Sequence, residues 1–592
     1  MAFEQASHSL PPHEEDKERR ESQTKSALSY VGDQEKVDHK PDAHDHDDIG
    51  PIKGDFSDGR VNWTTKQVLA TIGLCGLYVG SQIPLYFSGG ALTYIAISVG
   101  AADRASWIPV AYALVFSALS PFCGYLQDIM GRRNITLFGG VIVIVGNIIM
   151  ATTHSFAQAI AGMAITGAGA AIGELTALAG MSELVPVTKR GIYLAIVTVT
   201  IFPIFNSVSL AGIAAFYFPL SQTRAAGQTA KSILKQIDVG GAILSISGLT
   251  LILIALQSGG LFHPWSSAYV LCTLIIGILL VVAFAVWEWK FAKFPIIPHE
   301  MFTGQRVVAM ALVICFVAGM GLMAVVNFFP LMFSTVFTAD PLQVGLRTLA
   351  PGMANNIGAI VINTSLSYFK KYNRELLLLA TVIMSKHYLD PDPTYGLVPR
   401  WYRMANQPTM NYIAVFTGAL ATVTPDSQSL AITLGTFSSL GVGGIIVPAA
   451  TVAIIATPDT SIATCVALTL CIRQVGGSIG TAIYFNVLQT KLSSYLPASV
   501  AQYALAAGLP VNSTEEFVMT FLTAPDQAAL LPGVDATILE QAAIGTRWAY
   551  AAAFKYVWYT SVGFGCGAVI ACCFLGNTTR FHTNRIAAVV RG

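Results

Sequence analysis

Long apolar runs occupy most of the chain after residue 66 and constrain its fold more than any other feature. Because an α-helix rises 1.5 Å per residue, about 20 apolar residues cross the hydrocarbon core of a bilayer, which is about 30 Å thick. Runs of about this length or longer lie at 67–97, 106–126, 135–154, 157–180, 192–218, 239–256, 269–287, 308–334, 343–366, 427–456, 461–487 and 554–575. The sequence therefore predicts an all-α protein that crosses a membrane many times.

The charge content excludes several other classes of protein. Only 11% of the 592 residues are charged, whereas soluble domains usually carry about 25%. The basic residues are spread over the connections between the runs, so no basic patch predicts nucleic-acid binding. No run has His, Cys and Asp in metal-ligand spacing, and no nucleophile shares a helix face with a base. We therefore expect neither an enzyme nor a cofactor or metal site.

The most specific motif is GYLQDIMGRR, residues 124–133, in the short connection between the second and third runs. In such a connection, the carboxylate of Asp128 can cap or pair with a neighbouring helix end, while Arg132 and Arg133 hold the loop in the cytosol. We interpret Gly124, Asp128, Gly131, Arg132 and Arg133 as a conformational gate at the cytosolic rim, without a role in substrate contact. An ordinary positively charged turn is the alternative interpretation.

This motif resembles the Gly-x-Leu-x-Asp-x-x-Gly-Arg-Arg signature that major facilitator superfamily transporters carry between their second and third helices. The stretches GELTAL (173–178), SELVP (182–186), KRG (189–191) and FLGN (574–577), with the long last loop, resemble the fungal trichothecene efflux pump group of that superfamily. The resemblance runs from about residue 63 to the end. It implies a fourteen-helix drug:proton antiporter with two six-helix bundles and two helices inserted between them, which the runs 239–256 and 269–287 fit.

The chain departs from the family pattern in its N-terminal half. The family has an arginine, implicated in proton coupling, where Met163 precedes the stretch AITGAG at 164–169, and only Pro203 marks the antiporter signature of the fifth helix. In addition, the run 192–218 is too short for the two spans, about 40 residues, that the charges of the flanking connections require. We therefore predict that one helix of the N-terminal bundle is missing, and that this run forms one helix with any kink at Pro203.

A second irregularity interrupts the C-terminal half. Two half-length apolar pieces, 375–384 and 414–424, are separated by a polar segment, 385–413, that contains several prolines. Joined directly, the two pieces would make one span of the usual length. We interpret the interruption as a retained intron or an exon-boundary error, which transcript sequencing across this region would decide.

Charge and hydropathy together predict the domain organisation. The boundaries are a disordered cytosolic tail at 1–62, an N-terminal transmembrane bundle at 63–218, the two inserted helices with their linkers at 219–306, a C-terminal bundle at 307–576 and a cytosolic tail at 577–592. Within the C-terminal bundle we expect a long outward loop at 488–553. It carries Asn512-Ser513-Thr514, which makes Asn512 a glycosylation candidate.

Two ionisable side chains stand out within the apolar runs. An ionisable group costs about 2.5 to 3.5 kcal/mol at the centre of an inserted helix, so Glu174 and Arg473 are candidates for proton coupling. The alternatives are a structural pair or hydrogen bond for Glu174, and a helix–helix anchor for Arg473.

Uncharged polar residues on apolar helices suggest a cavity for a neutral, oxygenated ligand. The candidates are Asn327, Asn355, Asn356 and Asn363. Hydrogen bonds that hold helices together explain such residues equally well.

These observations and the resemblance together predict a monomeric secondary active transporter in the plasma membrane or the vacuolar membrane. It would export a small lipophilic metabolite or toxin in exchange for protons, so its expected partners are a small-molecule substrate, protons and the lipid bilayer. Substrate would bind between the two halves near the midplane. Proton-coupled uptake of a ferric siderophore, or a receptor-like relative that does not transport, are the alternatives.

Overall fold

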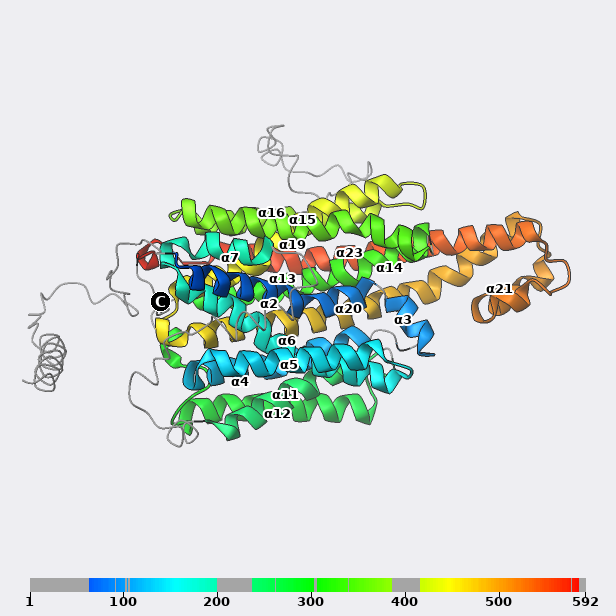
Figure 1. The fold of residues 1–592 in the computed structure, drawn as a ribbon. Helices are drawn as coiled ribbons and strands as arrows, with labels where there is room; N and C mark the ends of the chain where they lie inside the picture. Colours follow the sequence, from blue (N-terminus) through cyan, green and yellow to red (C-terminus); the bar gives the residue numbers. More distant parts are fainter. Residues whose placement is uncertain are drawn as a thin grey trace, which may run out of the picture. The chain divides into compact units, whose positions relative to one another are not determined.

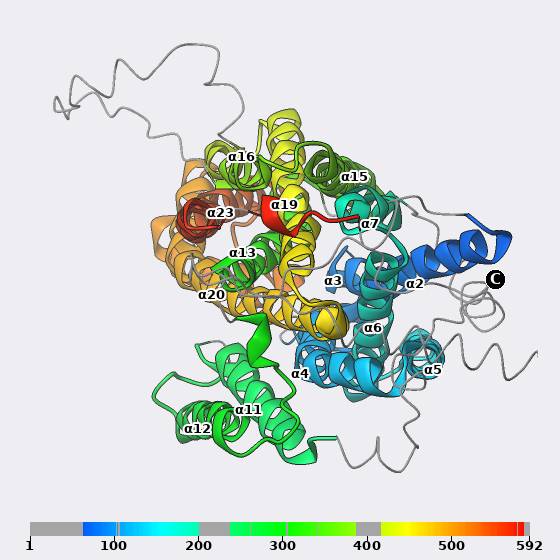
Figure 2. The same ribbon diagram turned by 90° about the vertical axis from the view of Figure 1, so that its left-hand side faces the viewer.

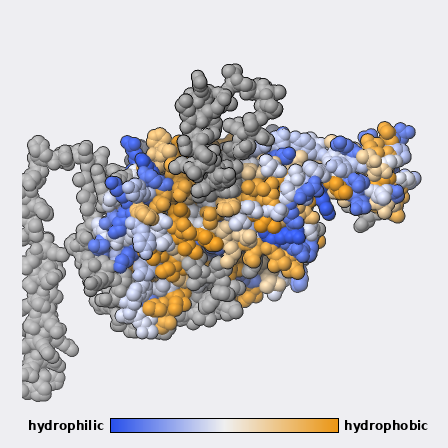
Figure 3. Space-filling model, turned by 90° about the horizontal axis from the view of Figure 1, so that it is seen from above, coloured by the Kyte–Doolittle hydropathy of each residue, from blue (hydrophilic) through white to orange (hydrophobic). Residues whose placement is uncertain are grey.

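The computed structural model describes residues 63–90, 92–101, 104, 107–199, 237–260, 262–302, 306–338, 340–385, 416–576 and 578–584. In these residues the regular elements are helices, and ten of the helices are long and apolar enough to cross a membrane. The predicted all-α polytopic architecture is confirmed. On the face shown in Figure 3, hydrophobic residues gather between more hydrophilic ends, as a membrane-spanning bundle requires.

The helix labelled α6 in Figure 1 is the central helix of the N-terminal half. The elements of this half are α2 (Thr65–Gly90), α3 (Leu92–Ser98), α4 (Trp107–Met130), α5 (Arg132–Ala151), α6 (Phe156–Leu184), η2 (Val187–Lys189) and α7 (Arg190–Val199). Helix α6 packs against α2, α4 and α5. Its glycines permit this, because a Cβ on Gly169 would lie 2.6 Å from the backbone nitrogen of Val143 on α5.

A helical hairpin follows, formed by α11 (Val239–Ser258) and α12 (Ala268–Lys290). Seen end-on in Figure 2, the hairpin lies beside α4 and α20 and apart from the remaining helices. Most of α12 is exposed, and its exposed residues are large and apolar, so this helix faces lipid. The hairpin corresponds to the two helices that the resemblance placed between the bundles.

The C-terminal half contains the longest helices. Its elements are η3 (His299–Met301), α13 (Arg306–Met323), η4 (Ala324–Phe328), α14 (Phe329–Met332), η5 (Phe333–Phe337), α15 (Pro341–Tyr368), α16 (Asn373–Ser385), α18 (Phe416–Ala419), η6 (Leu420–Thr422), α19 (Gln428–Ala456), η7 (Asp459–Ser461), α20 (Ile462–Ala506), η8 (Val511–Ser513), α21 (Thr514–Thr523), α22 (Pro525–Ala528), α23 (Ala536–Cys573) and η9 (Thr579–Phe581). From α13 to η5 the chain forms one span with two π-helical turns, η4 and η5, on either side of Pro330.

The segment 488–553, for which a long outward loop is predicted, is largely helical. Helix α20 continues to Ala506, and α23 already begins at Ala536 after a cap in which Asp535 accepts a hydrogen bond from the Ile538 nitrogen at 2.9 Å. Hydropathy missed these extensions because they are less apolar than the spans, although a cluster around Val500 and Phe517 holds them together. Asn512 lies exposed in η8, beyond the end of α20.

The two irregularities predicted from the sequence fall partly on residues outside those described. Helix α7 ends at Val199, and the predicted kink at Pro203 and the rest of the run to 218 lie outside the described residues. The missing N-terminal helix therefore stays a prediction. In the C-terminal half, α16 and α18 both pack against α19 and α23, which fits one interrupted span. Residues 386–415 of the interruption, and the tail 1–62, also lie outside the described residues.

Candidate functional site

The gate motif is helical almost throughout, which corrects the expected loop. Helix α4 runs to Met130 and α5 begins at Arg132, so only Gly131 separates them. Gly131 has φ +86°, a conformation that glycine adopts without steric cost and other residues rarely adopt. Gly124 is needed for a different reason, since a Cβ there would lie 3.0 Å from the Ala463 carbonyl of the C-terminal half.

Asp128 in the last turn of α4 joins the two halves. Its Oδ2 accepts hydrogen bonds from the Thr464 backbone nitrogen at 2.9 Å and from the Thr464 hydroxyl at 2.8 Å. Thr464 lies in the first turn of α20, where free backbone N–H groups and the helix dipole favour a negative charge. Asp128 was expected to cap a neighbouring helix end, and the helix that it caps is α20, in the C-terminal half.

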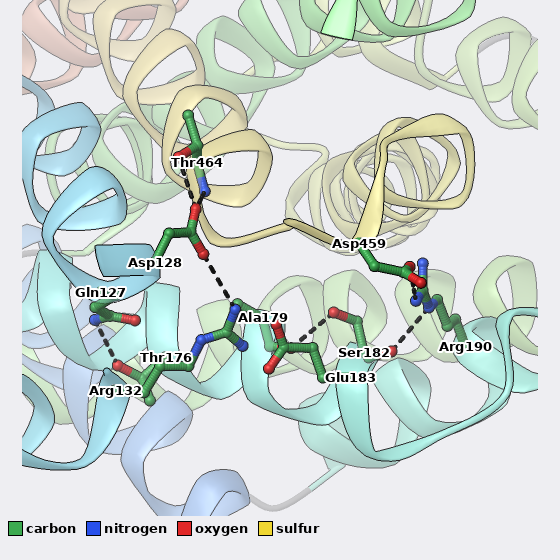
Figure 4. A network of polar contacts seen from close by, with 10 residues as sticks. All are labelled: Gln127, Asp128, Arg132, Thr176, Ala179, Ser182, Glu183, Arg190, Asp459 and Thr464. Carbon is green, nitrogen blue, oxygen red and sulfur yellow. Dashed lines mark hydrogen bonds and ion pairs between the residues drawn. The ribbon is translucent and has the colours of Figure 1, made fainter. Parts of the chain in front are cut away.

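Arg132 is buried, which corrects its expected position in the aqueous cytosol. It is 6% exposed, forms an ion pair with Asp128 at 3.4 Å and contacts Glu183 at the end of α6 through a second ion pair. Arg133 beside it is half-buried. Arg132 therefore fixes the orientation of Asp128, and Figure 4 shows this cluster below the start of α20.

Arg190 forms a second connection between the halves. Its guanidinium is fully buried, donates to the Ser182 carbonyl at 2.8 Å and lies 3.5 Å from Asp459 (Figure 4). It also donates to the Ile454 carbonyl at 3.1 Å. Ser182 belongs to α6, whereas Ile454 and Asp459 belong to the C-terminal half. Sequence analysis included Arg190 only in the stretch KRG (189–191) and gave it no role of its own, although the acidic residue Asp459 just after the 427–456 run was a signal.

The segment after α23 also contacts both halves. The Thr188 backbone nitrogen donates to the Thr583 carbonyl at 3.1 Å, and the side chain of Asn373 bonds Thr578 at 2.9 Å and the ring of His582 at 2.9 Å. Burial, and secondarily Lys370, lowers the pKa of His582 to about 4, so its ring is neutral near pH 7. Residues 578–584 of the predicted cytosolic tail therefore pack against both halves.

Glu174 and Arg473 are each other's partners. Arg473 Nη2 lies 2.7 Å from Glu174 Oε1 and donates a hydrogen bond to Oε2 at 2.9 Å. The carboxylate of Glu174 is fully buried. Sequence analysis named both residues as candidates for proton coupling but did not identify them as partners. The structure brings them together across the interface between α6 and α20.

The position of this pair along its helices places it deep in the membrane. Glu174 precedes Glu183 by nine residues on α6, and Arg473 follows Thr464 by nine residues on α20. At 1.5 Å per residue, the pair lies about 14 Å from the rim, close to the middle of a core about 30 Å thick. The same two helices thus carry a rim cluster and a midplane ion pair.

The four candidate cavity residues do not form one site. Asn363 accepts a hydrogen bond from Thr451 at 2.8 Å and joins α15 to α19, and Asn356 donates to Gly352 of its own helix at 3.5 Å. The backbone of Asn355 lies against Gly443. Asn327 differs, because it is buried in η4, which contacts both α2 and α20. Its Oδ1 has no hydrogen-bond partner among the described residues.

We expect Arg190→Met to destabilise the protein by about 3 kcal/mol, because removing one partner of a buried ion pair leaves the other charge poorly compensated. The change also removes the donors to two carbonyls. Thermal unfolding in detergent measures the effect. The matched control is Arg374→Met, since Arg374 is 53% exposed and pairs only with Glu375 in the described contacts, and exposed pairs contribute at most about 1 kcal/mol. Equal melting temperatures for the two variants would contradict this role.

Family models match two overlapping stretches, which run from the N-terminal half into the start of the C-terminal half. The family model of the Major Facilitator Superfamily matches residues 74–205, and that of the Fungal trichothecene efflux pump (TRI12) matches residues 188–343. Efflux pump dotC of Dothistroma septosporum is 27% identical over 333 residues, which cover 51% of this chain and 56% of that protein. The match therefore spans about half the length of that relative.

Two further relatives match over most of the chain. Efflux pump FUS6 of Gibberella moniliformis is 24% identical over 526 residues, which cover 83% of this chain and 84% of that protein. MFS-type efflux pump LUC4 of a Fusarium species is 25% identical over 530 residues, which cover 83% of this chain and 85% of that protein. Among solved structures, the human organic anion transporter MFSD10 (TETRAN) aligns with a TM-score of 0.45 at 13% identity, over 86% of this chain and 100% of that chain.

Proposed function

Because family models of the Major Facilitator Superfamily and of the Fungal trichothecene efflux pump match parts of this chain, we propose that it is a major facilitator transporter that exports a small lipophilic metabolite in exchange for protons. The observation that carries this proposal is the buried ion pair between Glu174 and Arg473, which joins the two halves near the midplane. The similar proteins described above are named efflux pumps, which favours export over uptake of a siderophore.

The rim contacts define one end state of the transport cycle. Asp128 holds the start of α20, and Arg190 holds the end of α19 and the connection after it. With these bonds made, the halves are joined on the side that carries the gate motif. Substrate then exchanges with the opposite side, and opening toward the cytosol requires these bonds to break. Rim bonds thus set the balance between the two states.

Glu174 is the proposed proton-binding group. Two buried opposite charges are tolerated because each compensates the other, so a proton on Glu174 leaves Arg473 as an uncompensated charge. Water that enters between separated halves solvates this charge, and protonation therefore favours separation. The family arginine that Met163 replaces is on the fourth helix, whereas the cation of this pair comes from α20 on the other half.

Asn327 is the proposed substrate contact. It is at the boundary of the halves, and its amide can donate to, or accept from, a neutral oxygenated compound. The neighbouring residue Phe328 contacts Tyr484 and Phe485, with ring centroids 5.6 and 4.7 Å apart, which provides an apolar aromatic surface close by. A lipophilic substrate with one or two polar groups fits such surroundings best.

Proteoliposomes with an imposed pH gradient test the proposed reaction. We expect labelled lipophilic metabolites to move against the proton flow, and the movement to stop when an ionophore collapses the gradient. Movement in the same direction as the protons would indicate a symporter and contradict export. A fluorescently tagged protein in a fungal cell identifies the membrane, for which we propose the plasma membrane.

A further inference from the structure

The hairpin of α11 and α12 is attached to the N-terminal half by apolar packing at its cytosolic end. Ala242 and Ile246 on α11 form a cluster with Tyr125 on α4 and with Ile296 in the chain after α12. The Tyr125 hydroxyl also donates to the Phe294 carbonyl at 3.3 Å. Tyr125 is part of the gate motif, so this end of the hairpin is fixed to the helix that carries Asp128.

Polar contacts within the hairpin make this end rigid. Glu288 on α12 accepts hydrogen bonds from the backbone nitrogens of Ile296 at 3.0 Å and Ile297 at 3.2 Å. Asp238 caps α11 and accepts a bond from the Trp287 indole at 3.0 Å. The two helices and the chain after them are therefore held as one body.

The other end of α11 is attached to the C-terminal half. Gln257, which is 2% exposed, donates from Nε2 to the Ser478 carbonyl of α20 at 2.6 Å. Two residues further on, the Gly259 carbonyl accepts a hydrogen bond from Asn486 of α20 at 3.2 Å. The turn that follows requires Gly260, which has φ +78°. One helix thus contacts the N-terminal half at one end and the C-terminal half at the other.

We infer that this hairpin is a brace between the halves, and that Gln257 is a positioning residue that holds α20 where Arg473 reaches Glu174. Ser478 follows Arg473 by five residues, so the contact lies about 8 Å along α20 from the ion pair. An apolar cluster must expose its surface to come apart, whereas a hydrogen bond can exchange partners. When the halves rotate, the hairpin therefore moves together with α4, and the hydrogen bond from Gln257 to α20 breaks and exchanges its partner.

The inference rests on the proposed function, because it assigns Gln257 a part in proton coupling. The test compares Gln257→Leu, which keeps the side-chain volume and removes the donor, with Ser247→Ala. Ser247 is on the same helix, but its hydroxyl bonds the Ile243 carbonyl of α11 itself. In proteoliposomes we expect Gln257→Leu to lower the maximal rate about tenfold and to shift the pH of half-maximal transport, with unchanged apparent affinity. Ser247→Ala should match the parent.

A second measurement does not depend on transport. Ser461 is 6% exposed at the rim, just before α20, and its side chain makes no capping hydrogen bond, so Ser461→Cys is a mild change. In an otherwise cysteine-free protein, we expect Gln257→Leu to increase labelling of this cysteine several-fold, because α20 leaves the rim more often. A parent that does not transport would contradict the proposed function but not the brace. Parent-like labelling in Gln257→Leu would overturn the brace, as would a parent-like pH profile.

Discussion

Glu174→Gln is expected to abolish the proton dependence of transport and to lower the free energy of unfolding by about 3 kcal/mol, although glutamine has nearly the same shape as glutamate. The reason is the partner of this carboxylate. Arg473 is buried and lies 2.7 Å from Glu174, so the neutral amide leaves a positive charge with poor compensation. Transport measured across a series of imposed pH gradients, together with thermal unfolding in detergent, checks both effects.

A double variant separates coupling from stability. Glu174→Gln with Arg473→Gln removes both charges, and we expect it to recover most of the lost stability, because a buried pair can often be replaced by neutral groups at little cost. Proton-dependent transport should not return. If the single variant kept the pH profile of the parent, Glu174 would be a structural residue only. If the double variant were less stable than the single one, the two charges would not be coupled.

The sequence predicted the spans well because each depends on a local property, the hydropathy of about 20 consecutive residues. It also identified Glu174 and Arg473, since a charge within an apolar run is costly wherever its partner is. It could not identify them as a pair, because residues 299 positions apart meet only through the packing of α6 on α20. The same limit applies to Asp128, whose helix-capping role was predicted without its partner Thr464.

Hydropathy predicted the structure less well at the ends of the spans and at contacts between the two halves. Arg132 was placed in an aqueous connection because arginine favours the cytosolic side, and Arg190 was given no role, yet Glu183 and Asp459 compensate these two arginines in buried positions. Helix α20 continues well past the apolar run that predicted it, because an apolar cluster with α21 and α23 stabilises the extension outside the span. In each case a partner distant in the sequence decided the structure.

Asp128→Asn is expected to lower the maximal transport rate about tenfold while leaving the apparent affinity for substrate unchanged. Asparagine can still accept hydrogen bonds from Thr464, but it loses the ion pair with Arg132 and the favourable interaction of a charge with the start of α20. Together these changes weaken the joined state by about 1 to 2 kcal/mol, which corresponds to about tenfold in its population. Initial rates at varied substrate concentration separate rate from affinity.

The same substitution at Asp340 provides the control. Asp340 caps α15 by accepting a hydrogen bond from the Leu342 nitrogen at 3.1 Å, and asparagine caps a helix about as well as aspartate. Helix α15 ends at Tyr368, and Ser367 in its last turn accepts a hydrogen bond from the Ile192 nitrogen near the rim, so Asp340 lies at the opposite end from the gate motif. Asp340→Asn should therefore transport like the parent. A raised apparent KM with a normal maximal rate in Asp128→Asn would place that carboxylate in the substrate path. Slow turnover at unchanged affinity is the behaviour that a bond between the halves predicts, because such a bond stabilises one end state without contacting the substrate.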